Sequence, residues 1–224
     1  MIEVKNLVKT YRDGEVETNV LKGVDFKAEN GEFIAIMGRS GAGKSTLLYQ
    51  MSLLDDPTSG EIIIDEQDAH KMDSEQKTKF RLQKCGYVFQ DYALVPELTS
   101  LENVVLPILM QRVEKPKAYD MAKEALLKVG LSHRLNNLPS QLSGGEQQRV
   151  SIARAIAHKP KILFADEPTA NLDNESSAKI MEIFTGLHKG GQTIIMVTHE
   201  EAYSQMAEKV VKIDDGKIIS IINT

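Results

Sequence analysis

The feature that most constrains this chain is a glycine-rich loop between an apolar run and a helical run. The loop reads Gly38-Arg39-Ser40-Gly41-Ala42-Gly43-Lys44-Ser45 and matches the pattern G-x-x-x-x-G-K-[ST]. The apolar run Phe33 to Met37 precedes it, and the helical run Thr46 to Met51 follows it. Glycines here let backbone N–H groups turn inward, and the helix adds its positive end. The sequence therefore predicts a phosphate-binding loop; the simpler alternative is a glycine turn with a solvated lysine.

The last residues of the loop carry the predicted nucleotide chemistry. Lys44 places a positive charge at the β- and γ-phosphates, and the Ser45 hydroxyl is suited to ligate Mg²⁺. The predicted nucleotide-binding residues of this segment are Gly38, Arg39, Ser40, Gly41, Ala42, Gly43, Lys44, Ser45 and Thr46.

Three further apolar runs have the composition of buried parallel strands. They are Tyr87 to Phe89, Ile162 to Ala165 and Ile194 to Val197. Helical patterns alternate with them, most clearly the spacing of Ile180, Ile183, Phe184 and Leu187, which stops at Gly190-Gly191. This alternation predicts an α/β fold.

The remaining segments differ from this alternation. Ile2 to Phe26 is predicted to form extended segments around Asp13-Gly14, and Lys209 to Ile222 a hairpin around Asp214-Asp215-Gly216. Between about residues 100 and 159 strand signals are absent. Ser100 is the expected cap of a helix kinked by Pro107, and a second helix begins at Pro116 and ends at Gly130. We expect a helical insertion within the α/β domain.

Two adjacent carboxylates end the predicted strand at residues 162–165. Asp166 is suited to hold Mg²⁺ through water, and Glu167 to orient the attacking water and accept its proton. Acidic residues capping a strand end would produce the same local sequence. The phosphate-binding loop earlier in the chain favours the catalytic interpretation.

A second candidate helix start lies at Leu142-Ser143-Gly144-Gly145-Glu146. Ser143 is a typical N-cap residue, and the two glycines allow close backbone approach. The positive end of this helix could also face a phosphate. Local structure alone favours simple capping.

Composition limits the classes of partner. The chain has 27 Lys and Arg against 32 Asp and Glu, a net charge of −5, so no nucleic-acid partner is expected. The single cysteine, Cys85, fits a reducing compartment. The longest apolar stretch, Val104 to Met110, is too short to span a bilayer, and charges at Glu3, Lys5 and Lys9 argue against a signal peptide. We therefore expect a cytoplasmic protein that reaches a membrane only through a partner.

Together the glycine loop, the LSGGE segment and the Asp166-Glu167 pair occur in the order and spacing of ABC-type ATPases, whose signature sequence is LSGGE. The resemblance covers about residues 2–219 and is carried by specific motifs. It implies a single ABC ATPase domain over residues 1–224. Its P-loop NTPase (RecA-like) core would cover about residues 1–95 and 160–224, with an N-terminal antiparallel β subdomain and an α-helical subdomain at about 96–159.

The resemblance also assigns roles to single residues. Tyr11 matches the aromatic residue that stacks on adenine, although it could simply be a strand aromatic. Gln90 matches the Q-loop glutamine, which touches Mg²⁺ and water, and His199 the switch histidine, which contacts the γ-phosphate. The implied catalytic residues are Lys44, Gln90, Glu167 and His199, and the implied metal ligands are Ser45, Gln90 and Asp166.

In this family the signature segment of one subunit faces the nucleotide held by another. The resemblance therefore implies that Ser143, Gly144 and Gly145, with Asp173 of the D-loop Ala170-Asn171-Leu172-Asp173, act across a head-to-tail homodimer formed on ATP binding. Two residues depart from the family pattern. Ala42 stands where serine is common in the loop, and Asn171 replaces the usual D-loop serine, which leaves the contact across the dimer open.

Segments at residues 53–60, 94–99 and 101–107 are similar to the subgroup that includes the MacB and LolD ATPases. That similarity implies ATP and Mg²⁺ as cofactors and an integral membrane permease as partner, with or without an extracytoplasmic accessory protein. The chain would then lie at the inner face of the cell membrane and serve export or extraction of a lipoprotein, peptide or drug. The alternatives are a division-type regulatory ABC ATPase that signals through a membrane protein, and a soluble ABC ATPase without a transport role.

Overall fold

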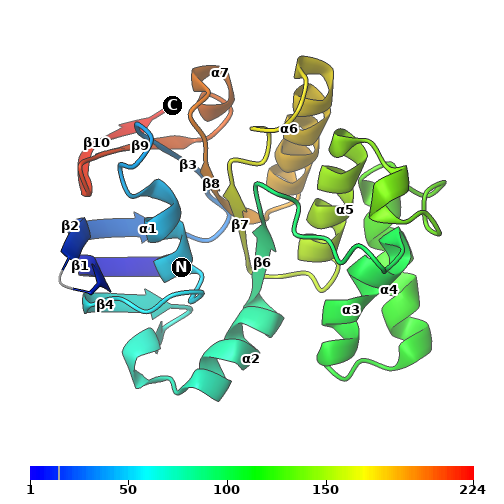
Figure 1. Cartoon of the computed structure of the whole chain (residues 1–224), viewed down its shortest axis with the longest axis horizontal. Coiled ribbons are helices and arrows are strands. Elements are labelled where there is room, and N and C mark those ends of the chain that lie inside the picture. Colours follow the sequence, from blue (N-terminus) through cyan, green and yellow to red (C-terminus); the bar gives the residue numbers. More distant parts are fainter. Residues whose placement is uncertain (15) are drawn as a thin grey trace.

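The computed structural model of the chain describes residues 1–14 and 16–224. Its strands are β1 (Ile2–Asp13), β2 (Val16–Ala28), β3 (Phe33–Met37), β4 (Ser59–Ile64), β5 (Gln67–Asp68), β6 (Cys85–Val88), β7 (Ile162–Asp166), β8 (Thr193–Val197), β9 (Lys209–Asp214) and β10 (Lys217–Asn223). Its helices are α1 (Lys44–Met51), α2 (Ser74–Lys84), α3 (Ser100–Met110), α4 (Lys115–Lys128), α5 (Gly144–Ile156), α6 (Asn174–Lys189) and α7 (Glu201–Ser204), with 3-10 turns η1 (Ala69–Lys71) and η2 (Pro139–Gln141). Figure 1 shows the strands at the left and centre and the group α3, α4 and α5 at the right.

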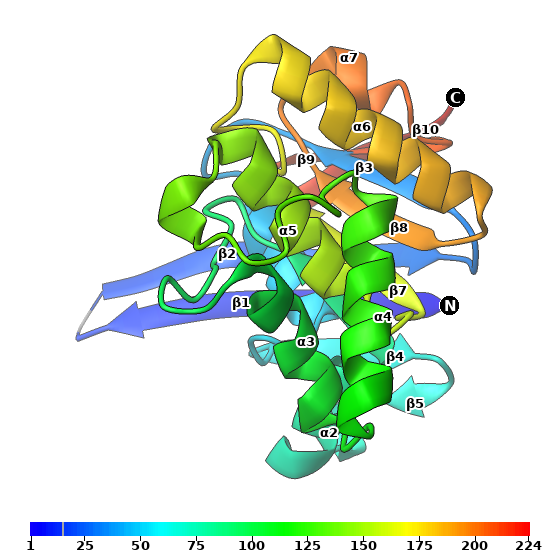
Figure 2. The same cartoon turned by 90° about the vertical axis from the view of Figure 1, so that its right-hand side faces the viewer.

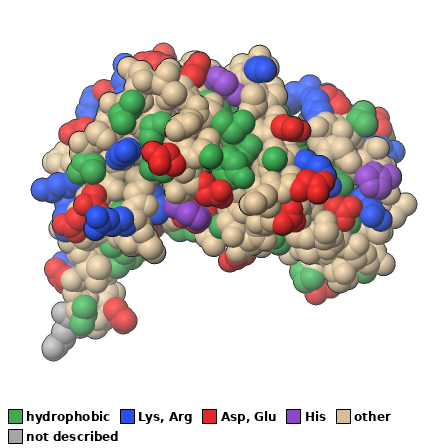
Figure 3. Space-filling view, turned by 90° about the horizontal axis from the view of Figure 1, so that it is seen from above, with side chains coloured by type: hydrophobic (Ala, Val, Ile, Leu, Met, Phe, Trp, Pro, Cys, Tyr) green, Lys and Arg blue, Asp and Glu red, His purple; other side chains and the backbone are tan. Residues whose placement is uncertain are grey.

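Within the described residues the strands form two sheets. One is a four-stranded antiparallel sheet in the order β2-β1-β4-β5. The other is a six-stranded sheet in the order β10-β9-β3-β8-β7-β6, in which β10 alone is antiparallel to its neighbour. Figures 2 and 3 both show the β1–β2 hairpin projecting from the body of the molecule. The predicted turn at Asp13-Gly14 partly falls on residue 15, which lies outside the described residues.

The six-stranded sheet is buried on both faces, because alternate residues of its central strands enter two different hydrophobic clusters. In β3, Phe33 and Ala35 pack toward α3, α4, α5 and α6, while Ile34 and Ile36 pack toward α1 and the antiparallel sheet. Side chains alternate along a strand, so a strand covered on both faces is apolar at every position. This explains why these strands were visible in the sequence as continuous apolar runs.

The helices of residues 100–156 pack on one another and reach the sheet where α5 contacts β6. Figure 2 shows α4 in front of α3 and α5 in this layer. The predicted apolar face of α4, with Ala118, Ala122, Ala125 and Leu126, is buried. One prediction is wrong: the N-cap of α3 is Thr99, which forms a capping box with Glu102, because Ser100 is buried and donates to the Asn137 carbonyl oxygen.

The C-terminal hairpin, predicted around Asp214-Asp215-Gly216, is present and contacts the glycine loop. The N–H of Gly216 donates to the carbonyl oxygen of Ala42 at 3.1 Å, and the carbonyl oxygen of Gly216 accepts from the N–H of Lys22 at 2.9 Å. A Cβ atom at Gly38 would lie 2.2 Å from the carbonyl oxygen of Ile213 in β9. The loop is therefore held in place by the far end of the chain.

The predicted fold class, an α/β P-loop fold with an antiparallel β subdomain, is confirmed. The sequence reading did not anticipate β4, β5 and α2. In the part of the chain that the structure describes, no helix is both long and apolar enough to cross a membrane. Figure 3 shows acidic and basic side chains interspersed over one face, in keeping with 27 Lys and Arg against 32 Asp and Glu in the sequence.

Candidate functional site

The glycine loop has the strand–loop–helix setting that the sequence predicts. β3 ends at Met37 and α1 begins at Lys44, so the loop lies at the carboxyl end of a central strand. Gly43 has φ 100°, and a Cβ atom there would lie 3.0 Å from the carbonyl oxygen of Val20. Only glycine combines this backbone angle with so close an approach.

Lys44 is almost fully buried at the start of α1. Its ammonium group donates to the carbonyl oxygens of Gly38 and Arg39, at 3.0 and 3.1 Å, and so curls back over the loop. The same ammonium lies 3.8 Å from a carboxylate oxygen of Glu167. A concentrated positive charge therefore stands inside the curve of the loop, where it can meet a phosphate.

Glu167 is held in an unusual backbone conformation directly after β7. Its φ is 43°, and its N–H donates to the carbonyl oxygen of Val197 at 3.0 Å, which fixes this left-handed turn. Its other carboxylate oxygen lies 3.1 Å from Nδ1 of His199. Non-glycine residues in this region of φ are uncommon and strained, and such residues concentrate at active sites.

Lys44, Glu167 and His199 thus converge from three separate elements. All three line one cavity of about 770 Å³ that also borders Gly38, Arg39 and Ser40. A cavity of that size accommodates a ligand larger than a single phosphate. The cavity combines a cation, a carboxylate and an imidazole beside a ring of loop amides.

Ser45 and Asp166 form the oxygen pair expected of a magnesium site. The Ser45 hydroxyl donates to Oδ1 of Asp166 at 2.9 Å. Burial of Asp166 raises its pKa, and the hydrogen bond from Ser45 opposes that rise only in part. Hydroxyl and carboxylate oxygens suit a hard divalent cation. Among the described residues no group of three His, Cys, Asp or Glu side chains is placed to hold a metal ion.

Gln90 lies two residues beyond β6, at the surface. Its backbone carbonyl oxygen accepts from the side-chain amide of Asn171 at 3.2 Å, and Asn171 also reaches the carboxylate of Asp91. No described residue, Ser45 and Asp166 included, forms a hydrogen bond with the Gln90 side chain. The contact of Asn171 gives that unusual D-loop residue a structural role within one chain.

The signature segment serves as a helix cap in this chain. The Ser143 hydroxyl accepts from the N–H of Glu146, and the Glu146 carboxylate accepts from the N–H of Ser143 at 2.9 Å. Cβ atoms at Gly144 and Gly145 would lie 3.0 Å from the Tyr92 hydroxyl and 2.7 Å from the Ser176 hydroxyl. None of these residues lines the cavity at the glycine loop.

Asp173 and Tyr11 also lie apart from the convergent triad. Asp173 is the N-cap of α6 and accepts from the N–H of Ser176 at 2.8 Å. Tyr11 stands near the end of β1 with 42% of its surface exposed, and its hydroxyl donates to Asp55. The structure therefore joins Lys44, Glu167, His199, Ser45 and Asp166, and distributes the other predicted residues around them.

Two residues of α5 that the sequence reading did not single out connect these groups. The fully buried Gln148 donates to the carbonyl oxygens of Pro168 at 2.8 Å and Phe89 at 3.4 Å. Arg154 donates to the carbonyl oxygens of Tyr92 and Ala93, both of which have positive φ. A polar residue on the buried face of an amphipathic helix was the signal that could have revealed Gln148.

Comparison with known proteins agrees with this geometry. Residues 21–170 match the family model described as ABC transporter. The uncharacterized ABC transporter ATP-binding protein MJ1508 of Methanocaldococcus jannaschii is 49% identical over 223 residues and is covered in full, as is this chain. The lipoprotein-releasing system ATP-binding protein LolD of Syntrophotalea carbinolica is 45% identical, with 97% of this chain and 96% of LolD covered.

A third relative is longer. The macrolide export ATP-binding/permease protein MacB of Campylobacter fetus is 42% identical over 98% of this chain, which corresponds to 34% of MacB. Among solved structures, the dimeric post-hydrolysis state of the ATP-binding cassette MJ0796, bound to ADP and Pi, superposes with a TM-score of 0.93 at 40% identity. The superposition covers 100% of this chain and 98% of the MJ0796 chain. The chain therefore belongs to the ABC transporter family, as an ATP-binding cassette ATPase similar to the LolD and MacB proteins.

Proposed function

We propose that this chain is the ATP-hydrolysing subunit of a LolD- or MacB-like exporter or extraction system, and that two copies close head to tail around two Mg·ATP to drive a membrane permease. The observation that carries the proposal is the division of the site. Lys44, Glu167 and His199 line one cavity, whereas Ser143 and the start of α5 lie outside it. Each chain would then contribute complementary halves of two sites.

Within the cavity we assign the bond-breaking step to Glu167. Its carboxylate orients a water molecule and accepts its proton as the water attacks the γ-phosphorus. His199, 3.1 Å from Glu167, holds that carboxylate in position and reaches the γ-phosphate with its second ring nitrogen. Lys44 leaves its loop carbonyl partners to neutralise charge on the β- and γ-phosphates.

The magnesium assignment rests on Ser45 and Asp166, whose paired oxygens suit a hard cation. When bound, Mg²⁺ neutralises phosphate charge and orients the β- and γ-phosphates. Gln90 is assigned to the same ion and to the attacking water, which requires its surface loop to move inward. Asn171, which binds the Gln90 carbonyl oxygen, would transmit that movement to the D-loop.

Complementation between two inactive variants tests the composite site. Lys44→Ala disables the loop side, and Ser143→Arg blocks the α5 side, where the exposed Ser143 leaves room for the larger side chain. In a mixed head-to-tail dimer one site carries both defects and the other carries neither. Mixing the variants should restore phosphate release to about a quarter of the wild-type rate if the two sites act independently. If each chain hydrolyses ATP alone, mixing would restore nothing.

The surface for the permease is an apolar groove of about 370 Å³ between α2, β6, α3 and α5. Its lining includes Leu54, Leu106 and Met110, which are 45%, 41% and 62% exposed, together with Phe89. None of residues 91–96, the segment after Gln90, lines this groove, and Leu94 of that segment packs against the hydrophobic core.

A short amphipathic helix of the permease is the proposed occupant, with its apolar face in the groove. Arg154 lines this groove and also holds the carbonyl oxygens of Tyr92 and Ala93 beside Gln90, so a helix seated there contacts the segment that leads to the nucleotide. In the MacB relative, about two thirds of the chain lie outside the matched cassette, and its name joins ATP-binding with permease. This contact would place the subunit at the inner face of the cell membrane.

Site-specific photocrosslinking tests the groove. A benzophenone side chain at Met110 should crosslink to an integral membrane protein in cells. The same group at Leu127, which is equally exposed at 62% but lies on α4, should not. Equal crosslinking from both positions would contradict the assignment.

A further inference from the structure

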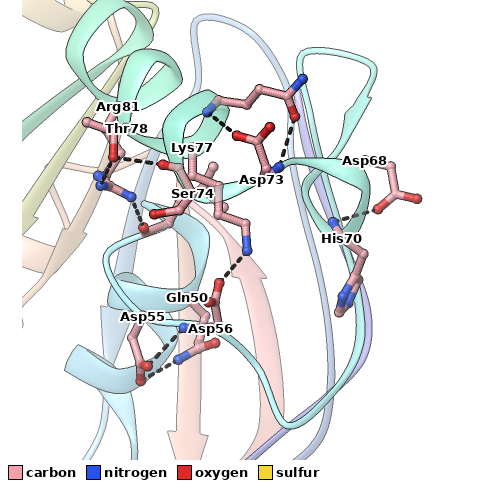
Figure 4. A network of polar contacts seen from close by, with 12 residues as sticks. Gln50, Asp55, Asp56, Asp68, His70, Asp73, Ser74, Lys77, Thr78 and Arg81 are labelled. Atoms are coloured by element: carbon pink, nitrogen blue, oxygen red, sulfur yellow. Dashed lines mark hydrogen bonds and ion pairs between the residues drawn. The ribbon is translucent and has the colours of Figure 1, made fainter.

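Asp55, in the connection between α1 and β4, accepts an unusual number of hydrogen bonds. One carboxylate oxygen accepts from the Lys9 ammonium and from the N–H of Asp56, each at 2.8 Å. The other accepts from the Tyr11 hydroxyl at 2.8 Å and from the Gln50 side-chain amide at 2.9 Å. Figure 4 shows Gln50 and Asp55 together, with Asp56 directed away toward Lys77.

The donors come from different elements. Lys9 and Tyr11 lie on β1, and Gln50 is a fully buried residue of α1, the helix that begins with Lys44. Asp55 therefore joins the strand that carries the exposed tyrosine to the helix that carries the phosphate-binding lysine. A carboxylate with four donors is held firmly, because moving it would leave several buried groups unpaired.

The two faces of the Tyr11 ring are not equivalent. The ammonium of Lys9 lies 4.7 Å from the ring centroid on one face and is fixed there by Asp55 and by the carbonyl oxygen of Asp56 at 2.6 Å. Lys9 is 9% exposed, while Tyr11 is 42% exposed. One face is thus closed by a cation, and a planar base can stack only on the other.

Burial and the bond to Asp55 together raise the pKa of Tyr11 to about 12, so the phenol keeps its proton and remains a donor to Asp55. The hydrogen bonds from Lys9 and Tyr11, acting against burial, lower the pKa of Asp55. The carboxylate is therefore charged throughout the physiological pH range.

From this geometry we infer that Asp55 is a positioning residue that sets Tyr11 and Lys9 for one-sided stacking of the nucleotide base, and that it couples base binding to the position of α1. The inference rests on the proposed adenine contact of Tyr11. Asp55 touches neither base nor phosphate, so its loss should weaken binding only of ligands that carry a base.

The test compares ATP with inorganic tripolyphosphate, which has the phosphates without the base. Asp55→Asn is close in shape but replaces an acceptor oxygen with a donor amide. Its Kd for ATP, measured by calorimetry with Mg²⁺ at low temperature, should rise about tenfold. Its Kd for tripolyphosphate should stay within about twofold of wild type. The control is Asp56→Asn, because the side chain of Asp56 pairs with Lys77 and not with Tyr11.

Tyr11 variants separate this inference from the proposed function. Tyr11→Ala should weaken ATP binding and spare tripolyphosphate, and an unchanged affinity for ATP would overturn the stacking role itself. Tyr11→Phe keeps the ring and removes the hydroxyl, and should reproduce most of the Asp55→Asn effect. If Tyr11→Ala weakens ATP binding while Asp55→Asn behaves like Asp56→Asn, the positioning role alone is overturned. An Asp55→Asn protein that loses affinity equally for both ligands would indicate a general structural defect and would also overturn it.

Discussion

The loop side of the site and the α5 side differ in what one chain completes. On the loop side, the Glu167 carboxylate already lies 3.8 Å from the Lys44 ammonium and 3.1 Å from the His199 ring, and Glu167 is fixed in a left-handed turn. On the α5 side, Ser143 and Glu146 satisfy each other in a capping box. Chemistry is preassembled on one side, whereas the other side offers a stable surface whose proposed ligand belongs to a second copy.

Helix α5 connects the two sides. α5 is tied through Gln148 to the loop after β7 and through Arg154 to the segment after Gln90. A displacement of α5 therefore reaches both the catalytic carboxylate and the apolar groove.

The largest expected effect comes from Glu167→Gln, which breaks the preassembled side. Loss of the proton acceptor should lower kcat for ATP hydrolysis by about a thousandfold. Because ATP would persist, a dimer should accumulate in sedimentation velocity experiments with Mg·ATP. Glu182→Gln, on the exposed surface of α6, is the matched control and should remain active and monomeric after turnover. A monomeric Glu167→Gln protein with normal hydrolysis would contradict the mechanism.

A smaller loss is expected from His199→Ala on the same side. Glu167 would lose the imidazole beside its carboxylate and keep Lys44, so kcat should fall about a hundredfold while the Kd for ATP changes little. Stopped-flow phosphate release and equilibrium binding of a fluorescent ATP analogue separate the two quantities. Weakened ATP binding with an unchanged kcat would indicate that His199 contacts the bound nucleotide but takes no part in catalysis.

The connection between the two sides is tested by Gln148→Leu. Its loss leaves the carbonyl oxygen of Pro168 unpaired in the interior and should lower the free energy of unfolding by about 1 to 3 kcal/mol. Hydrogen exchange should also quicken around Phe89. Gln147→Leu is the control, since that side chain bonds only to Leu142 at the start of its own helix. Equal losses from both variants would show that Gln148 does not join the two sides.

The smallest effect concerns the cap of α5 and pH. The N–H of Ser143, and then the Arg134 guanidinium, lower the pKa of Glu146 relative to the unfolded chain. A lowered folded-state pKa gives stability that is present above the unfolded pKa of about 4.3 and is lost as pH falls through the folded value. In urea unfolding at pH 7, the free energy of unfolding of the wild type should therefore exceed that of Glu146→Gln by about 1 kcal/mol or less. This difference in free energy of unfolding should become smaller toward pH 3. A larger difference at pH 3 would contradict a lowered pKa of Glu146 in the folded chain.

Some features were predictable because burial leaves a simple pattern. β3, β7 and β8 are apolar at successive positions since both faces of the central sheet are covered. α2 left little trace in the sequence because, of its described residues Ser74–Lys84, Phe80 alone is buried. The capping box of α2, between Asp73 and Gln76, was the local signal available.

The contacts of the site also fall into those that the sequence predicts and those that it does not. The pairing of Ser45 with Asp166 follows from motifs after β3 and at the end of β7, two parallel strands on either side of β8 whose carboxyl ends lie at the same edge of the sheet. The contacts of Asn171 with Gln90 and Asp91 could not be foreseen, because they join segments about 80 residues apart by surface geometry. The local role of Ser143 as a cap was predictable, whereas its ligand role depends on a second chain.

The clasp between the Gly216 turn and Ala42 bears on when the protein becomes active during synthesis. The glycine loop leaves the ribosome early, but β9, which pairs beside β3, and the turn that holds the loop are made near the end of the chain. A nascent chain therefore carries the complete motif without the support that shapes it. We therefore expect a chain cut before β9 to bind ATP more weakly than the chain that contains the hairpin.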